Sequence, residues 1–264
     1  MTNVKRNIRK VIRPLGMMLV NIGIDPRRLM SLRYYPKYRS QYRLFKKLGG
    51  VISHRYVILT DYGDQAGSAS GHYFHQDLLV ASFIHNKNPA RHIDIGSRID
   101  GFVAHVASFR KVEVMDVRDL SNVGHQNISF VKADLTNDDN AQKNITDSVS
   151  CLHAIEHFGL GRYGDPVDPG GHLKGFKNIL LMLKPGGTLY ISFPIGNSNE
   201  VHFNAHRVFR PKDILGWTEG KDRLRLERFD YVDDDGCLHQ NVDLENTDID
   251  VTFGCGIYTF EKLQ

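Results

Sequence analysis

The chain has few cysteines and no long hydrophobic run. Its 264 residues include only Cys151, Cys237 and Cys255, and none of them forms a CxxC pair. Such a sparse, odd set argues against a disulfide framework and a cysteine-rich zinc site, and it fits a reducing compartment. The longest apolar run near the start, residues 15–24, is about half of the ~20 residues that span a bilayer. We therefore expect a cytoplasmic protein with neither a transmembrane anchor nor a cleaved signal peptide.

Charge is unevenly distributed along the chain. Residues 1–50 carry thirteen lysines and arginines and one acid, Asp25, a net of +12, whereas the remainder carries a net of −8. Apolar residues at helical spacing, broken at Pro14, Pro26 and Pro36, predict a basic helical arm over residues 1–50, before a second domain over 51–264. We expect the arm to contact anionic membrane, at the inner face. A solvated arm that packs on its own acidic domain is the alternative.

The rest of the chain alternates short apolar strands with helical stretches. The expected strands are residues 92–95, 112–116, 128–132, 148–152, 188–193, 224–232 and 255–263, with a further strand-like run at 55–60, and the expected helices are 72–84, 102–109 and 172–183. This alternation predicts an α/β, Rossmann-like fold. Its seven-stranded, mostly parallel sheet would end in an antiparallel C-terminal edge hairpin.

Acidic residues stand at the ends of three consecutive predicted strands. Asp94 ends the first strand, Asp116 ends the second about 20 residues after Gly96, and Asp134 follows the third. Ligands of open α/β sheets bind beyond the carboxyl ends of strands, and an acid at the spacing of Asp116 binds ribose hydroxyls. Asp134 suits an adenine amino group. The three acids in series predict a nucleoside site.

The chain lacks the GxGxxG loop of dinucleotide-binding proteins. The loop after the first strand reads Gly96-Ser-Arg-Ile-Asp-Gly101, with Arg98 in place of the middle glycine. That glycine lets a pyrophosphate approach a helix N-terminus. Its absence disfavours a dinucleotide and favours a ligand without phosphates, such as S-adenosylmethionine.

Several segments resemble the motifs of class I S-adenosylmethionine-dependent methyltransferases in order and spacing. They are HIDIGSRIDGF, VEVMDVR, FVKADL, DSVSCLHAIEHFGLGRYGDP and LMLKPGGTLYISFP. With GHYFHQDLLVA, the set resembles a methyltransferase-like domain-of-unknown-function family, whose bacterial members are often encoded among polysaccharide-biosynthesis genes. The resemblance covers residues 50–262, so the basic arm lies largely outside it.

The resemblance implies a set of cofactor-binding residues. Asp94, Gly96 and Ser97 would line the methionine end, Asp116 would hold the ribose, and Val117, Asp134 and Leu135 would hold the adenine. The helix before the first strand usually closes over the cofactor, which makes Tyr73, His75 and Gln76 candidate lid residues. A polar helix start with surface histidines is the alternative.

The catalytic candidates lie in the segment Leu152-His-Ala-Ile-Glu-His-Phe158, after the fourth predicted strand. Transfer to a hydroxyl is helped by a general base, and imidazole has a suitable pKa. We predict His153 or His157 as the base, with Glu156 orienting either; alternatively, these residues only pack the helix and contact cofactor. The same residues match the H-x-x-E-H zinc-protease motif. That interpretation leaves the strand-end acids unexplained, and we expect no metal.

Two polar loops are predicted to shape the acceptor site. The first holds Arg162 and Tyr163, and the second, after the fifth strand, holds His202, Asn204 and His206. Long loops in compact domains are often functional, although the first loop could be a rigid cap and the second an edge-strand surface. Their polarity favours a hydrophilic acceptor.

The resulting hypothesis is S-adenosylmethionine-dependent methyl transfer to a hydroxyl of a sugar or polysaccharide-type acceptor, such as an O-antigen or capsule intermediate. No nucleic-acid-binding module is present, so nucleic acid is not expected as a partner. Two other hypotheses stay open: an NAD-linked oxidoreductase or epimerase of nucleotide sugars, and a non-catalytic methyltransferase fold that serves as an interaction module.

Overall fold

The chain forms two compact units in the computed structural model, Met1–Ser68 and Ala69–Gln264. The structure describes residues 26–121, 124–137, 142–217 and 224–263. The predicted helices before Pro26 and the apolar run at residues 15–24 lie outside these ranges. None of the described helices is long and apolar enough to cross a bilayer.

The described part of the first unit contains four short helical elements and irregular segments. It contains α2 (Pro26–Ser31), η1 (Leu32–Tyr34), α3 (Tyr35–Lys47) and η2 (Thr60–Gly63). Pro36 does not break a helix but stands in the first turn of α3, where a missing N–H group costs nothing. The strand expected at residues 55–60 is wrong: this stretch pairs with no strand among the described residues, and its apolar side chains from Tyr56 to Ile58 are exposed.

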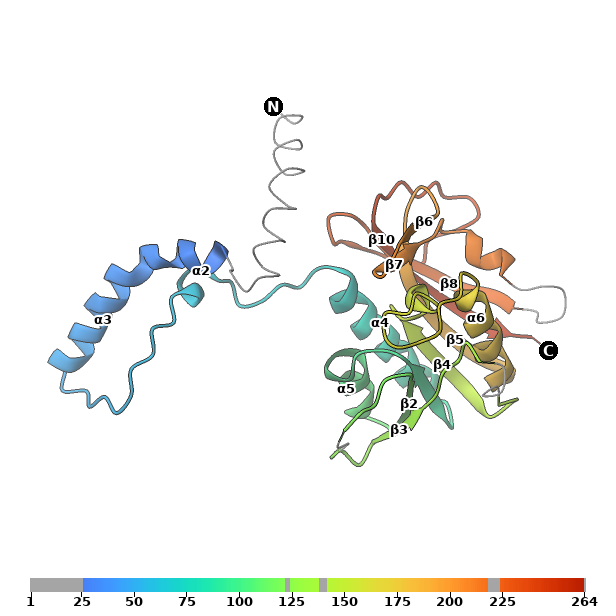
Figure 1. The fold of residues 1–264 in the computed structure, drawn as a ribbon, viewed down its shortest axis with the longest axis horizontal. Coiled ribbons are helices and arrows are strands. Elements are labelled where there is room, and N and C mark those ends of the chain that lie inside the picture. The colour runs from blue at the N-terminus through green and yellow to red at the C-terminus, as the bar shows by residue number, and fades with distance from the viewer. Residues whose placement is uncertain (1–25, 122–123, 138–141, 218–223, 264) are drawn as a thin grey trace. The chain divides into compact units, whose positions relative to one another are not determined.

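The second unit is built on an eight-stranded sheet with the order β3-β2-β1-β4-β5-β10-β8-β9 (Figure 1). The strands are β1 (His92–Ile95), β2 (Val112–Asp116), β3 (Ile128–Lys132), β4 (Thr146–Leu152), β5 (Leu183–Ile195), β8 (Leu224–Val232), β9 (Leu238–His239) and β10 (Gly254–Lys262). The first five pair in parallel, and β10 runs antiparallel to both β5 and β8. The predicted Rossmann-like α/β fold is confirmed.

Two details of the predicted sheet need correction. The sheet has eight strands rather than seven, because the turn at residues 233–236 folds β9 back onto β8; Asp233 closes this turn by accepting the backbone N–H groups of Asp235 and Cys237. The two predicted tail strands do pair antiparallel. However, β10 lies between β5 and β8, so the hairpin at the sheet edge is β8–β9.

Helices cover both faces of the sheet. They are α4 (His72–Lys87), η3 (Ile99–Val103) with α5 (Ala104–Ala107), and α6 (Gly171–Met182). Buried residues of α6, such as Phe176 and Ile179, belong to one apolar cluster, and those of α4 and α5, such as Val80 and Val106, belong to another. This two-sided cover is what a parallel sheet requires. The remaining elements are η5 (Ile155–His157), η6 (Asp213–Gly216) and a two-stranded sheet of β6 (Glu200–His202) and β7 (His206–Val208).

The segment 183–187, part of the LMLKPGGTLYISFP motif, forms a bulge at the start of β5. Thr146 pairs with Leu183 and Ser148 pairs with Thr188, so four residues of β5 bulge out between these two positions. Gly186 has a φ of +76°, a conformation that glycine adopts without strain. The bulge joins α6 directly to the central strand of the sheet.

A buried lysine caps the end of α6. Nζ of Lys262 donates hydrogen bonds of 2.8 Å to the carbonyls of Leu180 and Leu183. Replacing Lys262 with Met leaves both carbonyls without this charged donor, so we expect the unfolding free energy to fall by about 3 kcal/mol, or about 6–12 °C in Tm. Thermal denaturation measures the Tm of this variant and of the control Lys184→Met, which replaces an exposed lysine. Equal Tm values for the two variants would contradict this role.

Candidate functional site

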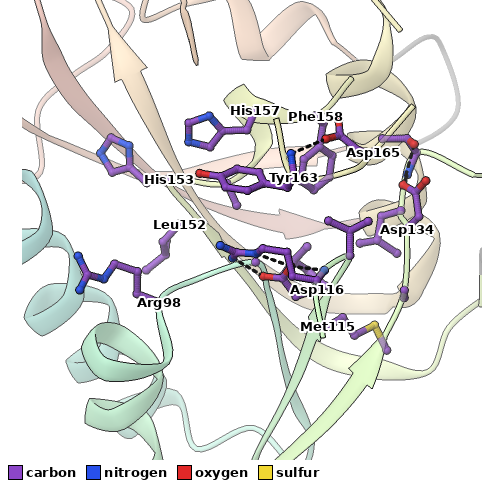
Figure 2. A pocket seen from close by; sticks show the side chains of 18 of the residues that line it. Arg98, Met115, Asp116, Asp134, Leu152, His153, His157, Phe158, Tyr163 and Asp165 are labelled. Atoms are coloured by element: carbon purple, nitrogen blue, oxygen red, sulfur yellow. Dashed lines mark hydrogen bonds and ion pairs between the residues drawn. The ribbon is translucent and has the colours of Figure 1, made fainter. Parts of the chain in front are cut away.

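The carboxyl ends of β1, β2 and β4, with the segment after β3, enclose a cavity of about 370 Å³ (Figure 2). This volume lies within the range of small-molecule sites. Residues from these ends, from α4 and from the loop after η5 line it: Tyr73, Ile95, Gly96, Arg98, Met115, Asp116, Val117, Arg118, Ala133, Asp134, Leu135, Thr136, Leu152, His153, Ala154, His157, Phe158, Tyr163 and Asp165.

The cavity brings together about half of the residues that the sequence predicted for the site. Those that line it are Tyr73, Gly96, Asp116, Val117, Asp134, Leu135, His153, His157 and Tyr163. Those outside its lining are His75, Gln76, Asp94, Ser97, Glu156, Arg162, His202, Asn204 and His206. The first group includes two of the three strand-end acids and both histidines proposed as the base.

Asp94 is buried beside the cavity, just before the lining residues Ile95 and Gly96. Its carboxylate is fully buried and accepts hydrogen bonds from the Ser97 backbone N–H (3.1 Å), the Ser97 hydroxyl (2.7 Å) and the Ser150 hydroxyl (2.6 Å). Burial raises the pKa of Asp94 to about 6, against the effect of these donors. Asp94 therefore ties the end of β1 to β4 and shapes the turn at Gly96, whose φ is +68°.

Asp116 faces the cavity, and its carboxylate is bound by the neighbouring Arg118. Its carboxylate accepts the Arg118 backbone N–H (2.8 Å) and a bidentate pair from the Arg118 guanidinium (2.9 and 2.6 Å). The guanidinium also lies 4.6 Å above the Tyr163 ring, across the cavity (Figure 2). The Arg118 side chain is 49% exposed and that of Asp116 is 11% exposed. A ligand that binds the Asp116 carboxylate therefore has to displace the half-exposed guanidinium of Arg118.

Asp134 also lines the cavity. Its carboxylate accepts the backbone N–H (2.8 Å) and the hydroxyl (2.7 Å) of Thr136. Apolar side chains of Met115, Leu135 and Phe158 belong to the same lining. The cavity thus combines acidic and apolar groups.

His153 and Glu156 form a buried pair after β4. The Glu156 carboxylate accepts a hydrogen bond of 2.8 Å from Nδ1 of His153, and the two side chains are 1% and 6% exposed, respectively. Burial disfavours the charged form of His153, but the Cys255 sulfur and Glu156 outweigh this effect and hold the pKa of His153 well above its usual value. His153 thus acts as a donor rather than as a free base.

His157 has the opposite character. Its Nδ1–H donates to the carbonyl of Ala205 at 2.6 Å, which fixes the tautomer and leaves the lone pair on Nε2. Burial lowers the pKa of His157, although Glu156 partly opposes this. At neutral pH the side chain is therefore an uncharged imidazole that lines the cavity.

The H-x-x-E-H interpretation is excluded by geometry. It requires His153 and His157 on one face of a helix. His153 instead leaves β4 with a φ of +48°, and only residues 155–157 form a short 3-10 turn.

The loop after η5 forms a fixed rim around the cavity. Asp165 accepts the backbone N–H groups of Gly159 (2.7 Å) and Tyr163 (3.2 Å). Buried Arg207 of β7 donates to the carbonyls of Phe158 and Pro169. These bonds favour the rigid-cap interpretation of the loop while holding Tyr163 at the cavity.

The β6–β7 hairpin lies beside this rim. Arg162 donates to the Ala205 carbonyl of the hairpin at 3.1 Å. Asn204 adopts a φ of +59° at the tip, the role of a turn residue. His202 is exposed and pairs with Glu200, and its ring lies 4.9 Å from that of His206. The predicted acceptor roles of these hairpin residues stay predictions.

At the start of α4, the predicted lid residues point in different directions. Tyr73 lines the cavity and its ring lies 5.0 Å from that of His153. Gln76 is buried and its side-chain oxygen accepts the Ser192 hydroxyl at 2.6 Å. His75 contacts the Phe74 ring edge-on. Only Tyr73 is placed to cover a ligand.

The sequence reasoning missed several cavity residues. Arg98 was treated only as a substitute for glycine, and Arg118, Phe158 and Asp165 were not singled out. The arginine two residues after a strand-end acid could have indicated an ion pair at Asp116. Nothing in the sequence indicated that Asp165 would fold back to hold the rim.

The comparisons with known proteins identify the fold. A family described as "Caenorhabditis protein of unknown function, DUF268" matches residues 104–216, less than half of the chain. No curated protein matches. The structure is similar to the cyclase SpnF (13% identity, TM-score 0.51, 83% of this chain and 92% of that one) and to YcgJ of Bacillus subtilis (10%, 0.50, 72% and 99%).

A 1,6-didemethyltoxoflavin-N1-methyltransferase from Burkholderia thailandensis, crystallised with 1,6-didemethyltoxoflavin and S-adenosylhomocysteine, has a TM-score of 0.49 (14% identity, 88% of this chain and 90% of that one). At such low identities the similarities show the fold alone. That fold is a Rossmann-like α/β fold.

The protonation of His157 is measurable without a substrate. Because burial lowers its pKa, we expect its titration midpoint below 6.5, with the Nδ1–H tautomer predominating above that pH. Nitrogen-15 imidazole spectra across a pH series report both quantities, and His157→Gln assigns the signal. A midpoint above 6.5 or a predominant Nε2–H tautomer would contradict the geometry.

Proposed function

We propose that this protein is a methyltransferase that binds S-adenosylmethionine in the cavity at the carboxyl ends of β1, β2 and β4. One observation carries the proposal: Asp116 and Asp134, from consecutive strand ends, line one cavity of nucleoside size. Methyltransferases of this fold are crystallised with S-adenosylhomocysteine, which agrees with the proposal but is a fact about those enzymes.

The residues present fit the nucleoside part of this cofactor. Asp116 offers two carboxylate oxygens to the ribose hydroxyls once Arg118 moves aside. Asp134 accepts a hydrogen bond from the adenine amino group, and the apolar side chains of Met115, Leu135 and Phe158 pack against the base. Gly96 lines the cavity where the methionine end would lie, and a side chain there would crowd its neighbour, because a Cβ would lie 2.9 Å from the Cβ of Ala154. When bound, the cofactor supplies an electrophilic methyl group on a sulfonium.

Of the two histidines that the sequence offered as the base, His157 is the better candidate. Its Nδ1–H is held by Ala205, so Nε2 is free to accept the proton that an acceptor hydroxyl loses. His153 donates its Nδ1–H to the buried carboxylate of Glu156, and we assign it a positioning role.

We further propose that the acceptor is a hydroxyl of a sugar or polysaccharide-type molecule. The support is the polar rim of the cavity, where Tyr163, Asp165 and Arg118 lie together. An aromatic ring beside charged hydrogen-bonding groups suits a hydroxyl-rich ligand.

The other hypotheses make different predictions for ligand binding. An NAD-linked enzyme needs a helix N-terminus open to pyrophosphate, whereas here Arg98 occupies the turn and pairs with Asp100. A non-catalytic module would bind the cofactor without turnover on any acceptor.

Calorimetric titration with S-adenosylhomocysteine tests the cofactor site. We expect the wild-type protein to bind it, and Asp116→Asn to bind about 10–100-fold more weakly because a charged acceptor of two hydrogen bonds is lost. Asp119→Asn is the matched control, since Asp119 is exposed and pairs with Lys132. Binding of NAD in place of S-adenosylhomocysteine, or equal affinities of the two variants, would reject the proposal.

The first unit supports a second proposal, peripheral attachment to anionic membrane. On α3 and just after it, Leu44, Phe45 and Leu48 are exposed, among the basic residues Lys37, Arg39, Arg43, Lys46 and Lys47. Exposed apolar side chains among cations are typical of helices that lie at a membrane surface.

Vesicle flotation of the full chain tests this attachment. We expect binding to vesicles that contain phosphatidylserine, and loss of binding at high salt. Replacing Arg39, Arg43 and Lys46 with Gln should weaken it about 100-fold, at about 1 kcal/mol per basic residue. Equal binding to neutral and anionic vesicles would rule out an electrostatic anchor.

A further inference from the structure

Three side chains of types that bind metal ions lie close together next to the cavity. They are His72 at the start of α4, His153 after β4 and Cys255 in β10, and one ligand atom of each lies within 4.8 Å of the others. The imidazole rings of His72 and His153 are stacked at 5.3 Å, 9° from parallel. We propose that these three residues bind a divalent transition-metal ion of the zinc type.

The second coordination sphere of such a site is already formed. Metal-bound histidines usually donate their other ring N–H to a carboxylate or a carbonyl. His153 donates Nδ1–H to Glu156 at 2.8 Å, which leaves Nε2 as the ligand atom. The backbone of Phe253 hydrogen-bonds to His72.

Buried polar atoms at this site lack partners. Nε2 of His153 and Oε2 of Glu156 make no hydrogen bond among the described residues, although the two side chains are only 6% and 1% exposed. Buried polar atoms without partners are rare because desolvation is not repaid. A metal cation that replaces the proton on Nε2 would give this atom a partner and would keep a positive charge beside the buried carboxylate.

The donor set determines the class of ion. Two imidazoles and a thiolate favour Zn²⁺ and related ions over Mg²⁺ or Ca²⁺, which prefer oxygen. A bound ion would draw the three atoms to about 3.3–3.6 Å from one another. The side-chain oxygen of Gln76, one helical turn after His72, accepts a hydrogen bond of 3.7 Å from Sγ of Cys255.

Three protein ligands leave one coordination position for another group. Catalytic zinc sites keep such a position, whereas structural sites use four protein ligands. Since His153 also lines the cavity, the ion would lie next to the proposed methyl-transfer site. An ion there would lower the pKa of an acceptor hydroxyl bound to it.

Metal analysis of the full-length protein tests the site. Protein purified without chelator from zinc-supplemented cells should hold about one zinc per chain. Cys255→Ser and His72→Asn should each hold less than about a tenth of that amount, and Glu156→Gln should bind zinc about 10–100-fold more weakly. Cys237→Ser and His75→Asn are the matched controls and should keep the wild-type content.

Cobalt spectroscopy identifies the thiolate ligand. After removal of zinc, Co²⁺ should give a near-ultraviolet thiolate-to-cobalt band in the wild type and in Cys237→Ser, but none in Cys255→Ser. Should Cys255→Ser fail to fold, the loss of the band in His72→Asn decides. Zinc-free wild-type protein without a cobalt band, or a band that survives in Cys255→Ser, would overturn the proposal. Titration of the same samples with S-adenosylhomocysteine separates this result from the cofactor proposal.

Discussion

The candidate site depends on one constraint, that parallel strands end at the same edge of a sheet. This brings residues about 20 positions apart in the chain into one cavity. Buried Asp94 makes the arrangement rigid, because its carboxylate joins the end of β1 to Ser150 of β4 and to the turn at Ser97. The cost of burying this carboxylate appears in its raised pKa. Groups with shifted pKa values cluster at functional sites, and Asp94 lies beside the turn at Gly96 that lines the cavity.

The histidines after β4 show how local geometry separates chemical roles. Glu156 is within hydrogen-bonding distance of His153 but 3.7 Å from Nε2 of His157. One histidine is therefore paired with a carboxylate, whereas the other donates to a carbonyl and keeps a free lone pair. If His153 binds a metal ion, its pairing with Glu156 is the second sphere of that site, and proton transfer falls to His157. The base and the metal proposals thus require the same assignment of His153.

The sequence predicted the parts of the fold that local patterns determine. Strands β1 to β3 start and end as expected, because apolar runs bounded by turns determine short buried strands. It missed β9 and the position of β10, which depend on pairing between residues distant in the chain. At the site it predicted Asp116 and Asp134 but not Arg118, and it singled out His75 rather than His72. Which side of α4 faces the sheet depends on the packing of the assembled sheet, and the local sequence pattern does not determine it.

The central claim is that the strand-end acids bind one nucleoside. A crystal structure of the full chain with S-adenosylhomocysteine tests it most directly. The account predicts ribose hydroxyls within hydrogen-bonding distance of Asp116, the Arg118 guanidinium displaced from that carboxylate, and the adenine beside Asp134. A nucleoside bound elsewhere, with the pair of Asp116 and Arg118 intact, would contradict it.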